Sequence, residues 1–597
     1  MLRIRRLGVV SYREAFDLQH ALAERARDDY VLLLEHPHVY TLGVRADPAN
    51  VLCDPATVGA ELVRTDRGGD VTYHGPGQLV VYPIVTLDAG PGSGPAHVRT
   101  LEQVVIDALG DLGVVAGRHD GYPGVWVGVR GTRGTDGPVP SSAPATPMTG
   151  TGDAHRKIAA IGVRAVRTPD GRRRTLHGVA LNVDCDLSMF GHIVPCGIAD
   201  FAVTSLRREG CGASIDEVAE AVATRAASVW GGGAVDRQDV SRRARDGGLD
   251  PAAALPLRSR KPEWLRTKAR IGQDFLRTSH TVHDLGLVTV CEEAGCPNIF
   301  ECWAEGTATF MVNGSRCTRA CRFCLVDTRR PLPLDPGEPV RVAEAVDRMG
   351  LAHAVITCVA RDDLPDGGAA AIAATVEAIR RRRPQTAVEV LVSDLKGTRD
   401  ALERVIAVRP NVFNHNVETV ARLQRAVRPS AGYARSLTVL ARAAHSGLSV
   451  KSGLMVGLGE SEDEVVATLA DLASVGVSIA TIGQYLRPSA THLPVARWWT
   501  PEELLALAAA GRSCGLLHVE ASPLTRSSYH AKRAADMVGA APGSRRTGGP
   551  ELEAANGVRS EAGPVAASAS SGSLGEVRRP GVPVPVPQRV GGTVRVG

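Results

Sequence analysis

The spacing of the cysteines limits more than any other feature what this chain can be. Of 12 cysteines among 597 residues, six lie between Cys291 and Cys324. They form two sets, spaced C-x4-C-x5-C and C-x3-C-x2-C: Cys291, Cys296 and Cys302, then Cys317, Cys321 and Cys324. Such clustering in a long chain indicates metal binding or catalysis rather than a disulfide framework.

Three cysteines in each set favour iron–sulfur clusters over zinc. Zinc sites usually pair C-x2-C units with one another or with histidines, and this stretch has a different pattern. Three thiolates leave the fourth iron of a [4Fe–4S] cluster without a cysteine ligand, so that this iron can bind a substrate or cofactor. We therefore predict two [4Fe–4S] clusters. A structural zinc site and unrelated free cysteines are the alternatives.

Segments between residues 261 and 535 resemble the lipoyl synthase family. CTRACRFC (317–324) resembles the signature of the radical S-adenosylmethionine superfamily, and VCEEAGCPNIFECW (290–303) narrows the likeness to lipoyl synthases. PNVFNHNVETV, KSGLMVGLGE and TRSSYHAK agree as well. The resemblance implies that the open iron binds S-adenosylmethionine and that one electron cleaves it to a radical. This chemistry would insert two sulfur atoms, at carbons six and eight of an octanoyl group.

The same resemblance assigns ligands to the two clusters. The cluster that binds S-adenosylmethionine would be held by Cys317, Cys321 and Cys324. The auxiliary cluster, which donates sulfur, would be held by Cys291, Cys296, Cys302 and Ser528. Read by itself, Ser528 is an ordinary loop serine. Cys358 and Ala360 stand where the family commonly has Ser and Asp, a departure that leaves all proposed ligands in place.

The N-terminal part contains a glycine-rich stretch, RGGDVTYHGPGQ (67–78), that allows close approach to a ligand, although such a stretch alone is often only a turn. KIAAIGVR (157–164), HGVALNV (177–183), PCGI (195–198) and VTSL (203–206) follow in that order. Together these segments resemble the lipoyl(octanoyl) transferase family, which moves an octanoyl group from acyl carrier protein to a lysine of a lipoyl domain.

Transfer from a thioester to an amide needs a nucleophile that accepts the acyl group and then releases it, as a cysteine thiolate does. The resemblance makes Cys196 that nucleophile, and Lys157 would lower its pKa because a nearby ammonium favours thiolate. Without that context, a cysteine in a PCG turn is more often structural. The acyl pocket would be lined by Arg67, Gly68, Gly69, Asp70, Val71, Thr72, Tyr73, His74, Ala160, Ile161, Gly162, Gly178, Val179 and Ala180.

The order of strand and helix patterns predicts a two-domain α/β chain. Residues 1–230 mix the two kinds of pattern and predict an α+β domain with a disordered insertion at 131–155. The resemblance implies that this domain is like the biotin/lipoate ligase catalytic domain. Residues 231–255 are predicted to be a linker. Residues 256–538 alternate strands and helices and predict a parallel, barrel-like sheet. The resemblance implies a partial (β/α) barrel of the radical S-adenosylmethionine type. Residues 539–597 are predicted to be a disordered tail.

The combined prediction is an enzyme that catalyses two consecutive steps of protein lipoylation. The implied partners are octanoyl-acyl carrier protein, lipoyl domains of 2-oxoacid dehydrogenase complexes or glycine cleavage H protein, and an electron donor such as ferredoxin or flavodoxin. Fusion would raise the effective concentration of one active site for the product of the other. The alternatives are a chain that retains only one activity and an iron–sulfur electron carrier fused to a carrier-protein binding module.

Composition limits which classes of partner and which cellular location we expect. A net charge of +5 and 4% aromatic residues give no case for nucleic-acid binding. No apolar run approaches the ~18 residues of a spanning helix, and the N-terminus lacks a signal-peptide pattern. We therefore expect a cytoplasmic protein that does not bind a membrane.

Overall fold

The computed structural model describes residues 1–88, 90, 92–128, 155–194, 202–240, 254–256, 259–267, 271–304 and 308–539. Cys196 lies outside these residues, as do most of the predicted insertion, the linker from 241 to 253 and the tail from 540. None of the helices in the described ranges is long and apolar enough to cross a membrane.

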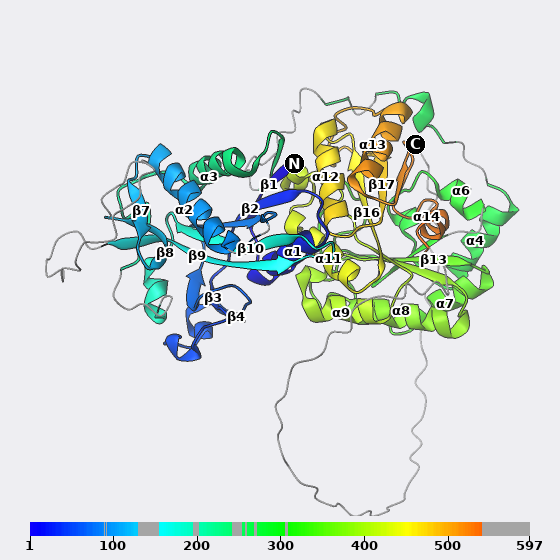
Figure 1. Cartoon of the computed structure of the whole chain (residues 1–597). Coiled ribbons are helices and arrows are strands. Elements are labelled where there is room, and N and C mark those ends of the chain that lie inside the picture. Colours follow the sequence, from blue (N-terminus) through cyan, green and yellow to red (C-terminus); the bar gives the residue numbers. More distant parts are fainter. Residues whose placement is uncertain are drawn as a thin grey trace, which may run out of the picture. The chain divides into compact units, whose positions relative to one another are not determined.

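The N-terminal half is built on an eight-stranded mixed sheet (Figure 1). Its strands, in spatial order, are β11 (Val235–Asp239), β1 (Leu2–Val9), β2 (Asp29–Glu35), β6 (Gln78–Ile84), β10 (Arg173–Asn182), β9 (Arg156–Arg167), β8 (Tyr122–Val127) and β7 (Ala116–His119). β1 runs parallel to β2 and β11, whereas the other neighbours are antiparallel. This mixed sheet confirms the predicted α+β class of the N-terminal half.

Helices cover both faces of this sheet. Because side chains alternate along a strand, Val31 and Leu33 of β2 pack with α2 (Ser93–Asp111) and α3 (Ile215–Trp230). Leu32 and Leu34 of the same strand belong to a second core that includes α1 (Tyr12–Arg25). All four side chains are buried, so β2 lies inside the half rather than at its edge.

One part of the predicted linker belongs to the sheet. Residues 235–239 form β11, which pairs with β1 from Leu2 to Arg6. The sequence VDRQD has one apolar residue and therefore did not read as a strand, but an edge strand needs little apolar surface. The predicted boundary at residue 230 is wrong for this reason, since the N-terminal sheet continues to Asp239.

A small sheet beside the large one carries part of the glycine-rich segment. Its strands, in spatial order, are β4 (Glu61–Arg64), β3 (Val39–Leu42) and β5 (Val71–His74). β5 pairs antiparallel with β3, so that residues 71–74 are extended strand rather than loop.

The C-terminal half contains seven parallel strands that are neighbours in the order of the sequence (Figure 1). They are β12 (Thr309–Val312), β13 (His353–Cys358), β14 (Ala387–Leu391), β15 (Val412–Asn414), β16 (Ser449–Val456), β17 (Ile479–Gln484) and β18 (His518–Ala521). The connecting helices are α7 (Glu338–Arg348), α8 (Ala369–Arg382), α9 (Arg399–Ala407), α10 (Gln424–Val427), α11 (Tyr433–His445), α12 (Glu462–Ser474) and α13 (Pro501–Cys514). In the described residues β12 and β18 are the end strands, which confirms the predicted partial barrel.

Short helices flank this barrel in the sequence. They are α4 (Gln273–Asp284), α5 (Val290–Glu293) and α6 (Ile299–Ala304) before it, and α14 (Ala531–Met537) after it. Ala534, Ala535 and Val538 pack on Val412 and Ile479, the first residues of β15 and β17. Since Val412 and Ile479 begin their strands, α14 contacts the end of the barrel opposite the carboxyl ends of the strands.

The two halves share one hydrophobic core and belong to one compact unit of the chain. A buried carboxylate lies where they meet. Asp471 of α12 accepts hydrogen bonds from Arg5 Nε at 2.8 Å, from the Tyr30 hydroxyl at 3.1 Å and from the Tyr433 hydroxyl at 2.9 Å. Asp471 is 1% exposed and Arg5 is 2% exposed, so that water does not replace these partners.

Replacing Asp471 by alanine should strongly destabilise the chain. The substitution leaves the Arg5 guanidinium buried without this carboxylate, and breaking one partner of a buried ion pair costs about 3–5 kcal/mol. Urea unfolding followed by circular dichroism measures the loss. Arg399→Ala, which removes an exposed pair with Glu403, should change the free energy of unfolding by no more than about 1 kcal/mol. Equal losses in the two variants would contradict the structural role of Asp471.

Candidate active sites

One cavity of the N-terminal half is lined by three of the segments that the sequence singled out. Residues of the glycine-rich stretch, of β9 and of β10 meet there. The predicted residues that line it are Arg67, Gly68, Gly69, Thr72, His74, Ala160, Ile161, Gly162, Gly178, Val179 and Ala180. Tyr12, Val80, Tyr82 and His177 complete the lining.

Three residues predicted for the pocket are turned away from it. Along β5 the side chains alternate, so that Thr72 and His74 line the cavity while Val71 and Tyr73 pack into a separate core. The carboxylate of Asp70 instead accepts a hydrogen bond from Asn50 Nδ2 at 2.7 Å. The prediction that every residue from 67 to 74 lines the pocket was therefore too broad, because alternate side chains of a strand point to opposite faces.

Glycine at position 178 allows β10 and β6 to approach closely beside the cavity. A Cβ atom at this position would lie 2.0 Å from the carbonyl oxygen of Val81, which is backbone and cannot rotate away. Only glycine fits here without moving the strand.

Arg67 is held in place by the protein itself. Its Nη2 donates to the carbonyl oxygen of Thr41 at 2.6 Å, its Nε donates to Thr41 Oγ1 at 3.1 Å, and the residue is 7% exposed. The guanidinium therefore fixes β3 against the glycine-rich segment.

The imidazoles around the cavity are kept neutral. Burial lowers the pKa of His74 well below its ordinary value, and the nearby His36 lowers it further. Burial also lowers the pKa of His36 to about 4 and that of His177. His74 Nδ1 donates to Gln78 Oε1 at 2.8 Å, and His177 Nε2 donates to Asp66 Oδ1 at 2.7 Å. Neutral rings together with Val80, Ile161 and Val179 suit an uncharged acyl chain.

Lys157 lies in β9, the strand that also carries Ala160, Ile161 and Gly162. Its Nζ is 5.3 Å from the centre of the Trp126 ring, a cation–π arrangement that orients the ammonium. Its backbone amide donates to the carbonyl oxygen of Ala202 at 2.9 Å. Cys196 lies outside the described residues. Ala202, which follows it in the sequence, lies directly beside Lys157 because of this hydrogen bond.

The second cysteine set follows β12 at the carboxyl end of the barrel strands. The Cys317 amide donates to the carbonyl oxygen of Asp327 at 2.8 Å, and that of Thr318 donates to Ala360 after β13 at 3.0 Å. Burial is the main cause that raises the pKa of Cys321 to about 11 and that of Cys324 to about 12, and the charges of neighbouring thiolates contribute to both values. Cys317 and Cys324 pack on the same small core, formed by Met311, Val326 and Val359.

The first cysteine set lies against the segment that contains Ser528. Asn298 Nδ2 donates to the carbonyl oxygen of Leu524 at 2.8 Å, and the Tyr529 hydroxyl donates to Glu301 Oε1 at 3.4 Å. Burial raises the pKa of Cys291 to about 11, with Cys296 adding to the effect. These contacts bring a segment more than 200 residues distant in sequence, Leu524 to Tyr529, against α6 and the loop that precedes it.

Each of the two sets offers three cysteine thiols, which are the donors that hold [4Fe–4S] clusters. Within the described residues, no group of three or more His, Cys, Asp or Glu side chains is arranged to hold one metal ion. In a [4Fe–4S] cluster each thiolate binds its own iron, so the ligands surround a volume rather than a point. The donor sets therefore fit the clusters expected from the sequence.

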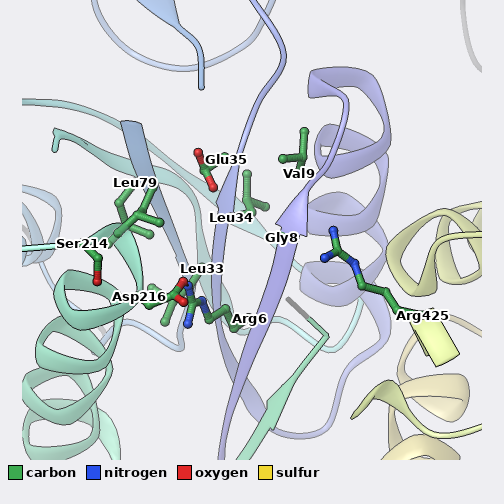
Figure 2. A pocket seen from close by; sticks show the side chains of 11 residues that line it. Arg6, Gly8, Val9, Leu33, Leu34, Glu35, Leu79, Ser214, Asp216 and Arg425 are labelled. Atoms are coloured by element: carbon green, nitrogen blue, oxygen red, sulfur yellow. The ribbon is translucent and has the colours of Figure 1, made fainter. Parts of the chain in front are cut away.

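Another cavity, of about 290 Å³, lies between β1, β2 and the start of α3 (Figure 2). Arg6 and Asp216 form an ion pair in its wall. Glu35 lines it too, and accepts a hydrogen bond from the Gly77 amide at 2.8 Å. The cavity contains none of the residues predicted for the sites.

Sequence reasoning missed the contribution of Tyr12 and His177 to the N-terminal cavity. Tyr12 begins α1, far from the glycine-rich stretch in sequence, and its hydroxyl donates to Thr65 Oγ1 at 2.9 Å. His177 directly precedes Gly178 and has a positive φ of 60°, which is unusual for a residue other than glycine. His177 belongs to the segment HGVALNV, which the sequence analysis had singled out, whereas no motif near Tyr12 pointed to the pocket.

Three family models match different parts of the chain. Residues 11–227 match the lipoyl protein ligase A/B catalytic domain. Residues 245–296 match the N-terminal domain of lipoyl synthase of the Radical_SAM family, and residues 311–472 match the radical SAM superfamily. The last two matches imply S-adenosylmethionine and [4Fe–4S] clusters as cofactors.

Individual proteins agree with these matches. The chain is 55% identical over 288 residues to a lipoyl synthase of Rubrobacter xylanophilus, an alignment that covers 47% of this chain and 90% of the relative. It is 52% identical to a lipoyl synthase of Mycobacterium ulcerans, covering 47% of this chain and 86% of the relative.

A solved structure, a bi-partite lipoate protein ligase from Thermoplasma acidophilum, is 17% identical and covers 40% of this chain and 85% of its own. Its TM-score of 0.29 is too low to support a conclusion.

The family models and the two lipoyl synthases decide the assignment. The chain belongs to the lipoyl synthase family of the radical SAM superfamily through its C-terminal half, and its N-terminal half is an acyltransferase domain of the lipoyl protein ligase A/B type.

Proposed function

We propose that this chain attaches an octanoyl group to a lipoyl domain and then converts it to a lipoyl group. The observation that carries the proposal is the joint presence of a cavity lined in part by apolar side chains and neutral imidazoles and of two separate cysteine sets. The N-terminal half would perform the transfer, and the C-terminal half would perform the sulfur insertion.

The transfer uses Cys196 as nucleophile. Its thiolate attacks the thioester carbonyl of octanoyl-acyl carrier protein, and the carrier thiol leaves with a proton. The amine of a lipoyl-domain lysine then attacks the octanoyl–Cys196 thioester, which forms the amide and returns the cysteine. Lys157 supports this role because its strand bonds to the chain that follows Cys196 and because an ammonium stabilises a nearby thiolate.

The cavity holds the octanoyl chain during both attacks. Val80, Ile161 and Val179 offer apolar surface, and the neutral imidazole of His74 adds no charge to the wall. Close strand packing at Gly178 leaves no room for a side chain at that position. The apolar side chains and neutral imidazoles of the wall suit a plain alkyl chain, although the lining also includes the Arg67 guanidinium.

The sulfur insertion depends on two clusters. Cys317, Cys321 and Cys324 hold the cluster that binds S-adenosylmethionine, and Cys291, Cys296, Cys302 and Ser528 hold the auxiliary one. When bound, these groups supply a radical that removes hydrogen from an unactivated carbon and the sulfur that takes its place. The contacts of Leu524 and Tyr529 with α6 and its neighbouring loop support the assignment of Ser528, since they bring its segment to the first cysteine set.

The reaction defines the partners. The acyl donor is octanoyl-acyl carrier protein, and the acceptor is a lipoyl domain of a 2-oxoacid dehydrogenase complex or the glycine cleavage H protein. An electron donor such as ferredoxin or flavodoxin is needed, because cleavage of S-adenosylmethionine consumes an electron.

The variant Cys196→Ser should separate the two steps. It should lose octanoyl transfer by roughly 10³-fold or more, because a serine hydroxyl is far less ionised than a thiol. It should still convert a lipoyl domain that already carries octanoate. Intact mass of the lipoyl domain, measured after anaerobic incubation with S-adenosylmethionine and reductant, reports both steps. Normal transfer by the variant would show that another residue is the nucleophile.

The variant Cys291→Ala should remove the auxiliary cluster alone. The iron content of the reconstituted chain should fall from about eight to about four atoms per chain, while octanoyl transfer stays unchanged. Cys514→Ser is the matched control, since Cys514 ends α13 and belongs to neither set. A wild-type chain that binds only about four iron atoms would refute the two-cluster assignment.

A further inference from the structure

We propose that the N-terminal half positions the cysteine loop 317–324 through a chain of ion pairs that begins at Glu14. Glu14 and the residues that continue the chain, Arg435, Asp394 and Arg319, are therefore positioning residues for the lipoyl synthase half. The inference rests on the proposed function only in taking Cys317, Cys321 and Cys324 as cluster ligands.

The chain starts where helix α1 packs against α11. Leu18 and Leu22 of α1 share a core with Leu437 and Leu440 of α11. At the edge of this core, Arg435 Nε donates to Glu14 Oε1 at 2.7 Å. The other carboxylate oxygen of Glu14 accepts from the Ser11 hydroxyl at 2.9 Å, as part of the capping box of α1. Both oxygens of Glu14 are thus in use.

Arg435 also faces a buried carboxylate of the barrel. Its Nη1 lies 3.9 Å from Oδ2 of Asp394, which follows β14 at the carboxyl end of that strand and is 1% exposed. That oxygen makes no hydrogen bond within the described residues. Arg435 therefore supplies positive charge to an oxygen that is otherwise buried without a partner, a costly arrangement if the arginine is removed.

The other oxygen of Asp394 reaches the cysteine loop. Oδ1 accepts from Nη2 of Arg319 at 2.6 Å, and Arg319 lies between Cys317 and Cys321 in sequence. Arg319 also donates to both oxygens of Asp362, at 2.8 and 2.9 Å. One guanidinium thus serves two carboxylates, and Arg435 is a second cation near Asp394 that is shared with Glu14.

The same turn of α1 reaches the N-terminal cavity. Tyr12 lines that cavity and lies two residues before Glu14. One helix end therefore contacts the proposed acyl site on one side and the ion-pair chain toward the cysteine loop on the other. A helix such as α1 can position a loop more precisely than another loop could, and the loop 317–324 must hold three ligands in place.

The test compares cysteine reactivity in the full-length, iron-free chain. The rate of iodoacetamide alkylation is measured for each cysteine by peptide mass spectrometry, in the wild type and in Arg435→Gln. Loss of the cation should let the loop open more often. Alkylation of Cys317, Cys321 and Cys324 should then rise roughly fivefold, the factor expected from a change of about 1 kcal/mol. The first cysteine set, Cys291, Cys296 and Cys302, serves as internal reference and should react at its wild-type rate.

A matched variant separates positioning from a weaker helix contact. Arg442 lies on the same helix, and its Nε donates to Asp17 Oδ2 of α1 at 2.6 Å, without an ion pair to Asp394. Arg442→Gln should leave the ratio of the two sets within about twofold of wild type, and Arg435→Lys, which keeps the charge, should restore it. Partial unfolding would raise the alkylation rates of both cysteine sets together. An unchanged ratio in Arg435→Gln, or the same change in Arg442→Gln, would overturn the proposal.

The result is independent of the proposed function, because the assay needs neither clusters nor activity. An unchanged ratio in a chain that inserts sulfur would remove the positioning role alone. A selective change in a chain that cannot insert sulfur would establish the positioning and remove the proposed function instead.

Discussion

The burial of charge where the two halves meet is the constraint on which much of this structure depends. Asp471 is buried in α12, and the groups that satisfy it come from β1, β2 and α11. An unpaired buried carboxylate is strongly destabilising, so Asp471 favours the arrangement in which these elements supply its partners. Buried ion pairs add little net stability over apolar residues of the same volume, but the loss of one partner leaves an uncompensated buried charge.

This packing changes how the fusion of two activities is understood. A flexible tether would raise the concentration of one site near the other through its length alone. In this chain α1 and α11 instead share a core and several ion pairs, including Arg435 with Glu14 and Arg442 with Asp17. The N-terminal half is thus a structural neighbour of the barrel, and one surface of α1 contributes to the environment of the cysteine loop.

Much of the barrel could be predicted from the sequence, because its signals are local. Strand and helix patterns alternate with short connections, and parallel strands then follow from the crossover geometry. Cys317 to Cys324 could be recognised since the spacing of these ligands lies within one loop. The N-terminal cavity was predicted in part: its glycine-rich and β-strand segments were identified, but the alternation along β5, which turns Val71 and Tyr73 away, became visible only with the strand itself. β11 was missed because an edge strand with a single apolar residue has no periodic pattern.

The sequence by itself determined the chemistry that this chain can offer: the six clustered thiols, the glycine-rich stretch and the order of elements in each half. Only the tertiary structure decided which distant groups complete the sites. Tyr12 reaches the pocket, the segment of Ser528 reaches the first cysteine set, and Glu14 connects through Arg435 and Asp394 to Arg319. The physical reason is that spacing along a chain fixes only near neighbours. The partner of a buried charge is set by which elements must pack together to exclude water.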